Sequence, residues 1–289
     1  MANLLSAIER TFWRINKYTN TKIIVDQIDF KVITPPKSKD FSLIIQGPIE
    51  KENLVFFINM IESYLTFLNP IQIIVVSSSI MKEAEDKLSR LKVRYVKVDY
   101  NPCGLGNISV QSRSVFEGIK YCTHELLVKT RTDQFIQRWD FIDAYLKEVR
   151  NDKLFICGYT LSYPKFHIGD MLHYGKKNLI SKVWGNTSSI EYINLASERY
   201  FQLRTSIKKD FVKSGEIYVG ISIADTYNID INESGAYEKM LIEKTIICSN
   251  SDIGLQWAKH NSIADFHRHG SNGFKPLIDH MSWLSLSKI

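Results

Sequence analysis

The sequence has little of what would mark a secreted or a zinc-binding protein. Its 289 residues include only four cysteines, which are far apart and form no paired CxxC spacing. They are Cys103, Cys122, Cys157 and Cys248. Neither a disulfide framework nor a structural zinc site is indicated, so a reducing compartment fits the chain.

Long apolar runs are also missing. No window holds ~18 uninterrupted apolar residues, and the N-terminus lacks the apolar core and the small-residue cleavage site of a signal peptide. We therefore expect a cytoplasmic protein that neither spans a membrane nor is exported. With 44% apolar and 24% charged residues, the chain has the composition of an ordinary globular protein.

Charge of one sign is not concentrated anywhere. The 37 Lys and Arg exceed the 31 Asp and Glu by six, but the basic residues are scattered and form no run of the kind that binds nucleic acid. We expect no nucleic-acid partner. A mildly basic surface suits anionic small molecules or the anionic face of a membrane.

Residues 1–17 combine apolar residues at helical spacing with a basic edge. The apolar positions are Leu4, Leu5, Ile8, Phe12 and Ile15, and the basic ones are Arg10, Arg14 and Lys17. The pattern predicts an amphipathic helix, which either lies on the inner face of a membrane or packs on its own domain. Pro35 and Pro36 then interrupt regular structure. We predict an N-terminal helix and connection over residues 1–38 and a single domain over residues 39–289.

From residue 41 onwards, short apolar runs alternate with helical patterns, which is typical of βαβ units in a parallel sheet. The expected strands are 41–45, 71–77, 93–98, 125–129 and 154–158, and the expected helices are 54–67, 82–90 and 110–121. Past residue 160 the rhythm is lost, and only 179–184, 190–207 and 236–244 keep helical spacing. The sequence thus predicts an α/β fold with a Rossmann-like, mostly parallel central sheet and flanking helices.

Ligands of an open parallel sheet bind beyond the carboxyl ends of its strands, so the residues that follow each strand are the first candidates. The first predicted strand ends in Gln46, Gly47 and Pro48, which suit either close approach to a ligand or a tight turn. The second ends in Ser77, whose hydroxyl can bond a nucleotide or serve as a cap. Asn107 and Gln111 belong to a stretch, residues 101–114, that leads into the third helix, whose first amide groups favour an anion.

The fourth predicted strand carries the most informative stretch. Lys129, Arg131 and Asp133 place two cations and a carboxylate at the sheet edge. The carboxylate can hold a divalent cation, Mn or Mg, that bridges a diphosphate, and the cations can offset phosphate charge directly. A surface ion pair of little energetic weight is the alternative. The chain lacks the GxGxxG and GxxxxGK spacings, so neither a dinucleotide-binding fold nor a P-loop ATPase is supported.

Several short motifs follow one another in good order between about residues 40 and 220. They are SLIIQGPI (42–49), IVVSSS (74–79), Asn107 with Gln111, Ser114 and Gly118, VKTRTD (128–133), FHIGD (166–170) with Gly175, and Glu216 with Ile217 and Tyr218. In these motifs the sequence resembles the WavE lipopolysaccharide-synthesis family, whose members look like glycosyltransferases of the A-type nucleotide-diphospho-sugar (GT-A) fold. The resemblance implies transfer of a sugar from a nucleotide-sugar donor to a bacterial lipopolysaccharide or capsule glycan. Residues 40–160 would bind the donor and residues 161–289 the acceptor.

By this resemblance, Gln46 and Gly47 would lie against the nucleotide. Asp133 would stand where such enzymes place the last acid of an Asp-x-Asp metal site, while Arg131 replaces the first acid. Because one carboxylate holds a divalent cation weakly and an arginine can supply part of its charge, metal-dependent and metal-free transfer both stay open.

Inverting transfer to a hydroxyl also needs a base within reach of the attacking oxygen. We predict Asp170 for this role, with Glu216 as the reserve; a cap of the turn before Met171 is the structural alternative for Asp170. His267, near Gly270, is a further candidate for closing over the diphosphate or completing a metal site. Two other functions remain possible: a nucleotidyl or phosphosugar transferase, and a non-catalytic nucleotide-binding subunit of polysaccharide assembly.

Overall fold

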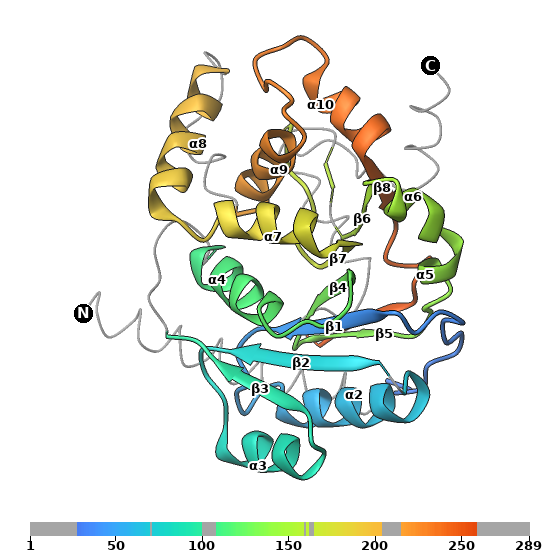
Figure 1. Ribbon diagram of the computed structural model, residues 1–289. Coiled ribbons are helices and arrows are strands. Elements are labelled where there is room, and N and C mark those ends of the chain that lie inside the picture. The colour runs from blue at the N-terminus through green and yellow to red at the C-terminus, as the bar shows by residue number, and fades with distance from the viewer. Residues whose placement is uncertain are drawn as a thin grey trace, which may run out of the picture.

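Seven strands form one mixed sheet in the order β3-β2-β1-β4-β7-β6-β8 (Figure 1). They are β1 Phe41–Gln46, β2 Gln72–Ser77, β3 Arg94–Lys97, β4 Leu126–Arg131, β6 Leu154–Cys157, β7 Leu172–Lys176 and β8 Thr245–Cys248. Neighbouring strands are parallel except where β7 pairs with β4 and β6. The computed structural model describes residues 28–69, 71–99, 108–158, 160–161, 165–203 and 215–258. The predicted α/β fold with a Rossmann-like, mostly parallel sheet is confirmed.

Helices cover both faces of the sheet. They are α2 Leu54–Phe67, α3 Lys82–Arg90, α4 Ile108–Ile119, α5 Phe141–Ala144, α6 Leu146–Arg150, α7 Lys177–Asn186, α8 Ile190–Gln202, α9 Gly215–Thr226 and α10 Ala236–Lys239, which continues as a π-helical turn, Met240–Lys244. A second, two-stranded sheet pairs β5 Gln134–Ile136 with β9 Leu255–Trp257. None of the helices that the structure describes is both long enough and apolar enough to cross a bilayer.

The alternation of side chains along β1 shows which helices lie on which face. Gly118 of α4 packs closely on Ile44, because a Cβ at residue 118 would come within 3.3 Å of its side chain. Phe41, on the opposite face of β1, stacks on Trp139, which contacts Tyr64 of α2 edge-on. Helices α4 and α7 therefore cover one face and α2 the other, as Figure 1 shows.

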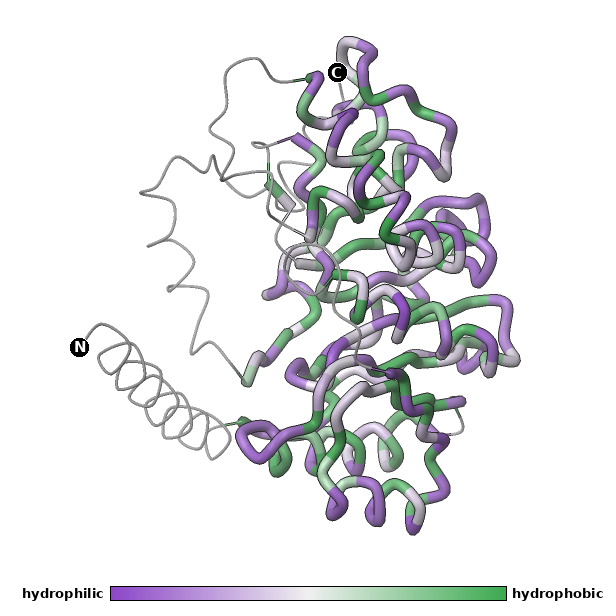
Figure 2. Tube along the Cα trace, turned by 90° about the vertical axis from the view of Figure 1, so that its left-hand side faces the viewer, coloured by the Kyte–Doolittle hydropathy of each residue, from purple (hydrophilic) through white to green (hydrophobic). Residues whose placement is uncertain are grey.

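Hydrophobic residues gather between these layers, whereas hydrophilic stretches lie at the outer turns (Figure 2). Every residue of β1, β6 and β8 is buried, as expected for strands covered by helices on both faces. Such a core excludes water from the interior of the sheet. Polar side chains inside it therefore need specific partners.

The predicted elements before residue 160 are confirmed, with one change that matters. The fourth strand was expected to end at Lys129, but β4 continues to Arg131. Its last residues are polar and resemble a loop in the sequence, yet they pair with Ile45 and Gln46 of β1. Lys129 and Arg131 are therefore strand residues with side chains on the same face.

After residue 160 the sequence patterns missed more. The strands β7 and β8 and the helix α9 were not expected, and the stretch 236–244 divides into α10 and a π-helical turn. One sheet thus contains strands from both sides of residue 160. Residues 33–38 lie against the 137–143 segment, where the amide of Ile33 donates to the carbonyl of Gln137 at 2.7 Å. The predicted amphipathic helix over residues 1–17 lies outside the described residues.

Candidate functional site

The carboxyl ends of β1 and β4 form a topological switch point. The chain leaves β1 to add β2 on one side and later adds β4 on the other, and ligands of open α/β sheets bind at such a point. The two strand ends are joined through Thr132, whose amide donates to the carbonyl of Gln46 and whose hydroxyl donates to that of Pro48, both at 3.0 Å. Gly47 has φ +137°, and a Cβ there would lie 2.6 Å from the Thr132 Oγ1. Only glycine fits this junction.

Strand register places three predicted site residues on the α4 and α7 face. Gln46 pairs with Arg131, and Ile44 pairs with Lys129. Strand β7 runs antiparallel to β4, so the residues that precede it reach the same edge of the sheet. Asp170, two residues before β7, is thereby brought to the carboxyl end of β4. In the sequence, Asp170 lies about forty residues after the end of β4.

Arg131 links two acidic side chains at this edge. Its Nε and its second terminal nitrogen donate to the two oxygens of Asp133 at 3.0 and 3.2 Å, and its other terminal nitrogen lies 3.4 Å from Asp170 Oδ2. Gln111 of α4 donates to the same Asp170 oxygen at 2.7 Å. Asp170 thus uses its carboxylate for these contacts and does not cap the turn before Met171.

The charged groups of this cluster shift one another's pKa values. Burial alone would raise the pKa of Asp170, but Arg131 and then Lys129 outweigh burial and lower it. Burial also disfavours the charged form of Arg131, yet Asp133 and Asp170 raise its pKa above the ordinary range. Both groups are therefore ionised at neutral pH.

Lys129 lies beneath this ion pair and has no exposed surface. Its ammonium donates to the backbone carbonyl of Asp170 and sits 4.5 Å from the ring centre of Trp184 in α7. Burial lowers the pKa of Lys129 to about 7, against the opposing effect of the Asp170 carboxylate. Its charge therefore titrates in the physiological range.

Glu216 belongs to the same neighbourhood, since its charge raises the pKa of both Lys129 and Arg131. It lies in the first turn of α9, and its carbonyl accepts from the amide of Ile168 at 3.3 Å. The helix can approach this segment because Gly220 has no side chain; a Cβ there would lie 2.0 Å from the carbonyl oxygen of Phe166. The two predicted acids, Asp170 and Glu216, thus act on the same two cations from different elements.

Of the remaining predicted site residues, the structure describes Ser77 but not the other two. Ser77, at the end of β2, donates to the carbonyl of Ser79 at 2.5 Å and accepts from its amide at 3.1 Å. It closes a turn instead of capping α3, which begins at Lys82 with no side-chain cap. Asn107 and His267 lie outside the described residues.

Sequence patterns did not single out two residues that complete the cluster. His173 of β7 pairs with Lys129 across the strands, and Trp184 lies in α7. Both look like core residues in the sequence. The motif FHIGD, three residues before His173, was the nearest available signal.

The donor set does not fit a divalent cation at Asp133 as it stands. Both carboxylate oxygens accept from the Arg131 guanidinium in a charge-assisted, fork-like pair. Within the described ranges, no three His, Cys, Asp or Glu residues are grouped so that they could hold a metal ion. Metal binding by Asp133 stays a prediction from the resemblance.

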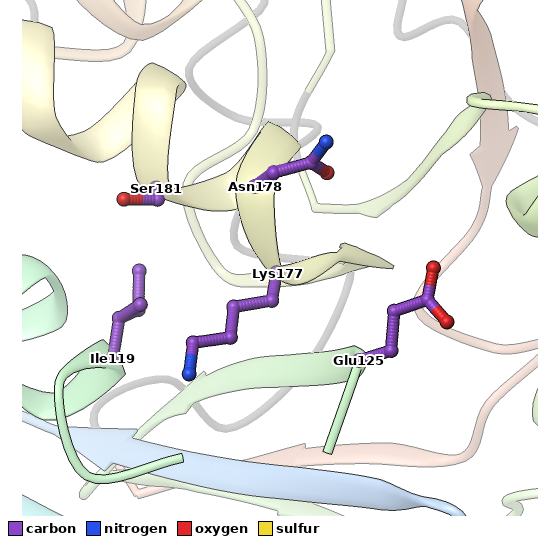
Figure 3. A pocket seen from close by; sticks show the side chains of 5 residues that line it. All are labelled: Ile119, Glu125, Lys177, Asn178 and Ser181. Atoms are coloured by element: carbon purple, nitrogen blue, oxygen red, sulfur yellow. The ribbon is translucent and has the colours of Figure 1, made fainter. Parts of the chain in front are cut away.

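A separate cavity of about 440 Å³ lies at the opposite edge of the sheet (Figure 3). It is lined by Ile119, Glu125, Lys177, Asn178 and Ser181. Glu125 precedes β4 and Lys177 follows the antiparallel β7, so this is the amino edge of the parallel strands. The Lys177 ammonium donates to the carbonyl of Cys122 at 2.6 Å. The cavity is remote from the charged cluster.

No family model and no curated protein matches the chain. Among solved structures, it is similar to the galactosyltransferase LgtC in complex with donor and acceptor sugar analogues (10% identity, 62% of this chain, 70% of that one, TM-score 0.41). It is also similar to glucosyl-3-phosphoglycerate synthase from Mycobacterium tuberculosis with Mn²⁺, UDP and glucosyl-3-phosphoglycerate (12% identity, 68% of this chain, 82% of that one, TM-score 0.39). A third similar structure is 4-diphosphocytidyl-2C-methyl-D-erythritol synthase from Anaerococcus prevotii (15% identity, 81% of this chain, 96% of that one, TM-score 0.39). At these TM-scores the likenesses carry no functional argument, and the WavE resemblance stays a prediction.

Proposed function

We propose that the chain is a nucleotide-sugar-dependent glycosyltransferase that extends a bacterial surface glycan of lipopolysaccharide or capsule. One observation supports this above all: a guanidinium held between two carboxylates at the switch point of a parallel sheet. Such an edge suits a bound nucleotide and, next to it, a reaction that needs both a cation and a base.

Arg131 would stabilise the departing nucleoside diphosphate. Its side chain is 20% exposed, compared with 5% for Asp133 and 13% for Asp170, so it offers the most surface of the three to a ligand. Its pairing with two acids holds the guanidinium in place before a phosphate binds, which is the kind of preorganisation that favours a transition state. Lys129 has no exposed surface, so it would add positive charge to the site without touching the diphosphate.

The nucleotide would lie over the junction of β1 and β4. Gln46, Gly47 and Pro48 form that junction, where the absence of a side chain at Gly47 lets the end of β1 lie close to Thr132. Ser77 ends the neighbouring strand β2. Gln111 would contribute less directly, because its amide nitrogen donates to Asp170.

Asp170 would take the proton of the acceptor. In this step the acceptor hydroxyl oxygen bonds to the anomeric carbon, the bond from that carbon to the diphosphate oxygen breaks, and the hydroxyl proton passes to the Asp170 carboxylate. The lowered pKa keeps Asp170 ionised and able to accept a proton at neutral pH. Glu216 is the reserve for this role.

The proposal is tested by incubating the full chain with UDP-, GDP-, CDP- and CMP-linked sugars and a glycan acceptor extract, and by measuring the nucleotide product. Release of a nucleoside diphosphate or monophosphate together with a lengthened glycan is expected. In a parallel incubation with nucleoside triphosphates and sugar phosphates, release of pyrophosphate would instead support a nucleotidyl transferase. Binding of donors without any turnover would support a non-catalytic subunit.

Contact with the membrane through residues 1–17 and a location at its inner face are part of this proposal. An acceptor on a lipid carrier would explain a basic amphipathic segment, because anionic lipids attract basic residues. Flotation with vesicles of anionic lipid tests this contact. Neutral vesicles serve as the control.

A further inference from the structure

Hydrogen bonds hold the backbone of Gly169 and Asp170 on several sides. The carbonyl of Gly169 lies 2.8 Å from His173 Nε2, and its amide donates to Thr160 Oγ1 at 3.3 Å. The carbonyl of Asp170 accepts from Lys129, while Gln111 and Arg131 hold its carboxylate. Few positions of the backbone satisfy all these contacts together, so the direction of the Asp170 carboxylate is fixed.

Trp184 sets the role of each His173 nitrogen. An indole N–H can only donate, and it donates to His173 Nδ1 at 3.2 Å. Nδ1 is therefore the acceptor, and in the neutral ring the proton stays on Nε2, which then donates to the Gly169 carbonyl. Burial, with a smaller effect of Lys129, lowers the pKa of His173 to about 3, so the ring is neutral at physiological pH.

The same tryptophan also contacts Lys129. The lysine ammonium lies over the indole ring at 4.5 Å, and the His173 and Trp184 rings are 5.2 Å apart. Lys129 and His173 are cross-strand partners on β4 and β7. A single side chain of α7 thus supports both donors that hold the peptide carbonyls of residues 169 and 170.

We propose that His173 and Trp184, together with Lys129, are positioning residues that aim the Asp170 carboxylate at the acceptor. This inference rests on the proposed function, in which Asp170 takes the acceptor's proton. A buried polar group costs stability unless it is paired, and an apolar core would serve the fold at lower cost. His173 and Lys129 hold two successive carbonyls, those of Gly169 and Asp170, and Trp184 contacts both of these side chains, which favours a role in placing this segment.

The test compares two substitutions of His173. In His173→Gln the side-chain amide reaches roughly the position of Nε2 and can still donate to Gly169, whereas in His173→Asn the shorter side chain cannot. We expect His173→Asn to lower kcat by about 10- to 100-fold with the KM for the donor unchanged, because a displaced base costs turnover and not donor binding. His173→Gln should recover most of the rate.

Thr245→Val is the matched control. It removes a buried hydrogen bond from a side chain to a backbone carbonyl, in this case the 2.8 Å bond to Leu241, at the opposite edge of the sheet. It should lower stability without changing kcat per folded molecule. A His173→Asn variant with the kcat of the control would overturn the proposal, as would a His173→Gln variant as slow as His173→Asn.

A second measurement does not depend on catalysis. The ring nitrogens of His173, followed by NMR, should show the proton on Nε2 in the wild type. In Trp184→Phe, which keeps a ring under Lys129 but lacks the N–H, both tautomers should appear. A wild-type proton on Nδ1 would contradict the arrangement.

If the wild type transfers no sugar from any donor, the proposed function fails, but amide exchange can still test the positioning of the backbone at residues 169 and 170. Backbone amides of residues 169–171 should then exchange with solvent faster in His173→Asn than in Thr245→Val. Equal exchange rates would overturn the positioning role.

Discussion

Two arginine–aspartate pairs in this molecule have the same chemistry and different surroundings. Arg199 of α8 binds Asp225 of α9 through two bonds of 2.9 Å, and the Tyr192 hydroxyl donates to the same carboxylate at 2.6 Å. Arg131 instead bridges Asp133 and Asp170 at the carboxyl edge of the sheet, beside a buried lysine.

The two ion pairs differ in position and in the number of charges that they bring together. The Arg199 pair fastens two helices at the periphery with one cation for one carboxylate. The Arg131 cluster brings several charges together at the carboxyl edge of the sheet, where they shift one another's pKa values. Strongly perturbed groups in such a position are typical of functional sites.

The largest contrast is expected between two aspartate substitutions. Asp170→Asn should lower kcat roughly 10²- to 10⁴-fold without weakening donor binding, because it removes the proposed base and keeps the size of the side chain. Asp225→Asn should leave kcat per folded molecule unchanged. Steady-state kinetics on both variants measures this contrast, and an Asp170→Asn enzyme of unchanged rate would remove the assignment.

The Arg199–Asp225 pair should matter for stability and not for turnover. Arg199→Met leaves Asp225 with one partner fewer, and we expect a loss of roughly 1.5–3 kcal/mol in the free energy of unfolding, as for hydrogen bonds to charged groups. Urea denaturation measures it. No loss of stability would mean that the α8–α9 pair does not fasten the helices.

Lys129 should make stability depend on pH. Its pKa is about 7 in the folded chain, against 10.5 for an ordinary lysine. Between these values the unfolded chain binds more protons, so the contribution of Lys129 to the free energy of unfolding rises with pH across that window and is constant below it. Lys129→Met should remove this rise, which chemical denaturation at pH 7 and at about pH 10 can show. An identical pH dependence in both proteins would contradict the lowered pKa.

Chelation should have the smallest effect. Because both oxygens of Asp133 accept from Arg131, donor binding should be the same in EDTA and in Mn²⁺. Thermal shift with each donor in both conditions measures it. A shift seen only with Mn²⁺ would contradict this expectation and show that donor binding needs the metal.

The sequence predicted the first strands and helices well because their apolar residues repeat over long stretches. Helices 54–67 and 82–90 have the predicted bounds. Strand β7 was missed because it has only five residues, and histidine, glycine and lysine interrupt its apolar pattern. Its antiparallel direction depends on pairing with β4 and β6, which no local pattern contains.

The residues of the candidate site also divide into those that local sequence patterns predicted and those that only the fold reveals. Strand ends pointed to Gln46, Arg131 and Asp133, since chemistry in parallel sheets collects there. The partners of Asp170 could not be predicted, because Gln111 and Arg131 meet it only after β7 has turned back along β4. His173 and Trp184 resemble core residues until the fold shows which atoms they contact.

The most direct test of the central claim is a titration of wild type, Arg131→Met and Arg199→Met with each nucleotide sugar by calorimetry. Wild type and Arg199→Met should bind one donor with equal affinity, and Arg131→Met should bind it at least ~10-fold more weakly, which corresponds to the loss of a charge-assisted contact to phosphate. Equal binding of that donor by all three proteins, or no binding of any donor by the wild type, would contradict a nucleotide-sugar site at the carboxyl edge of this sheet.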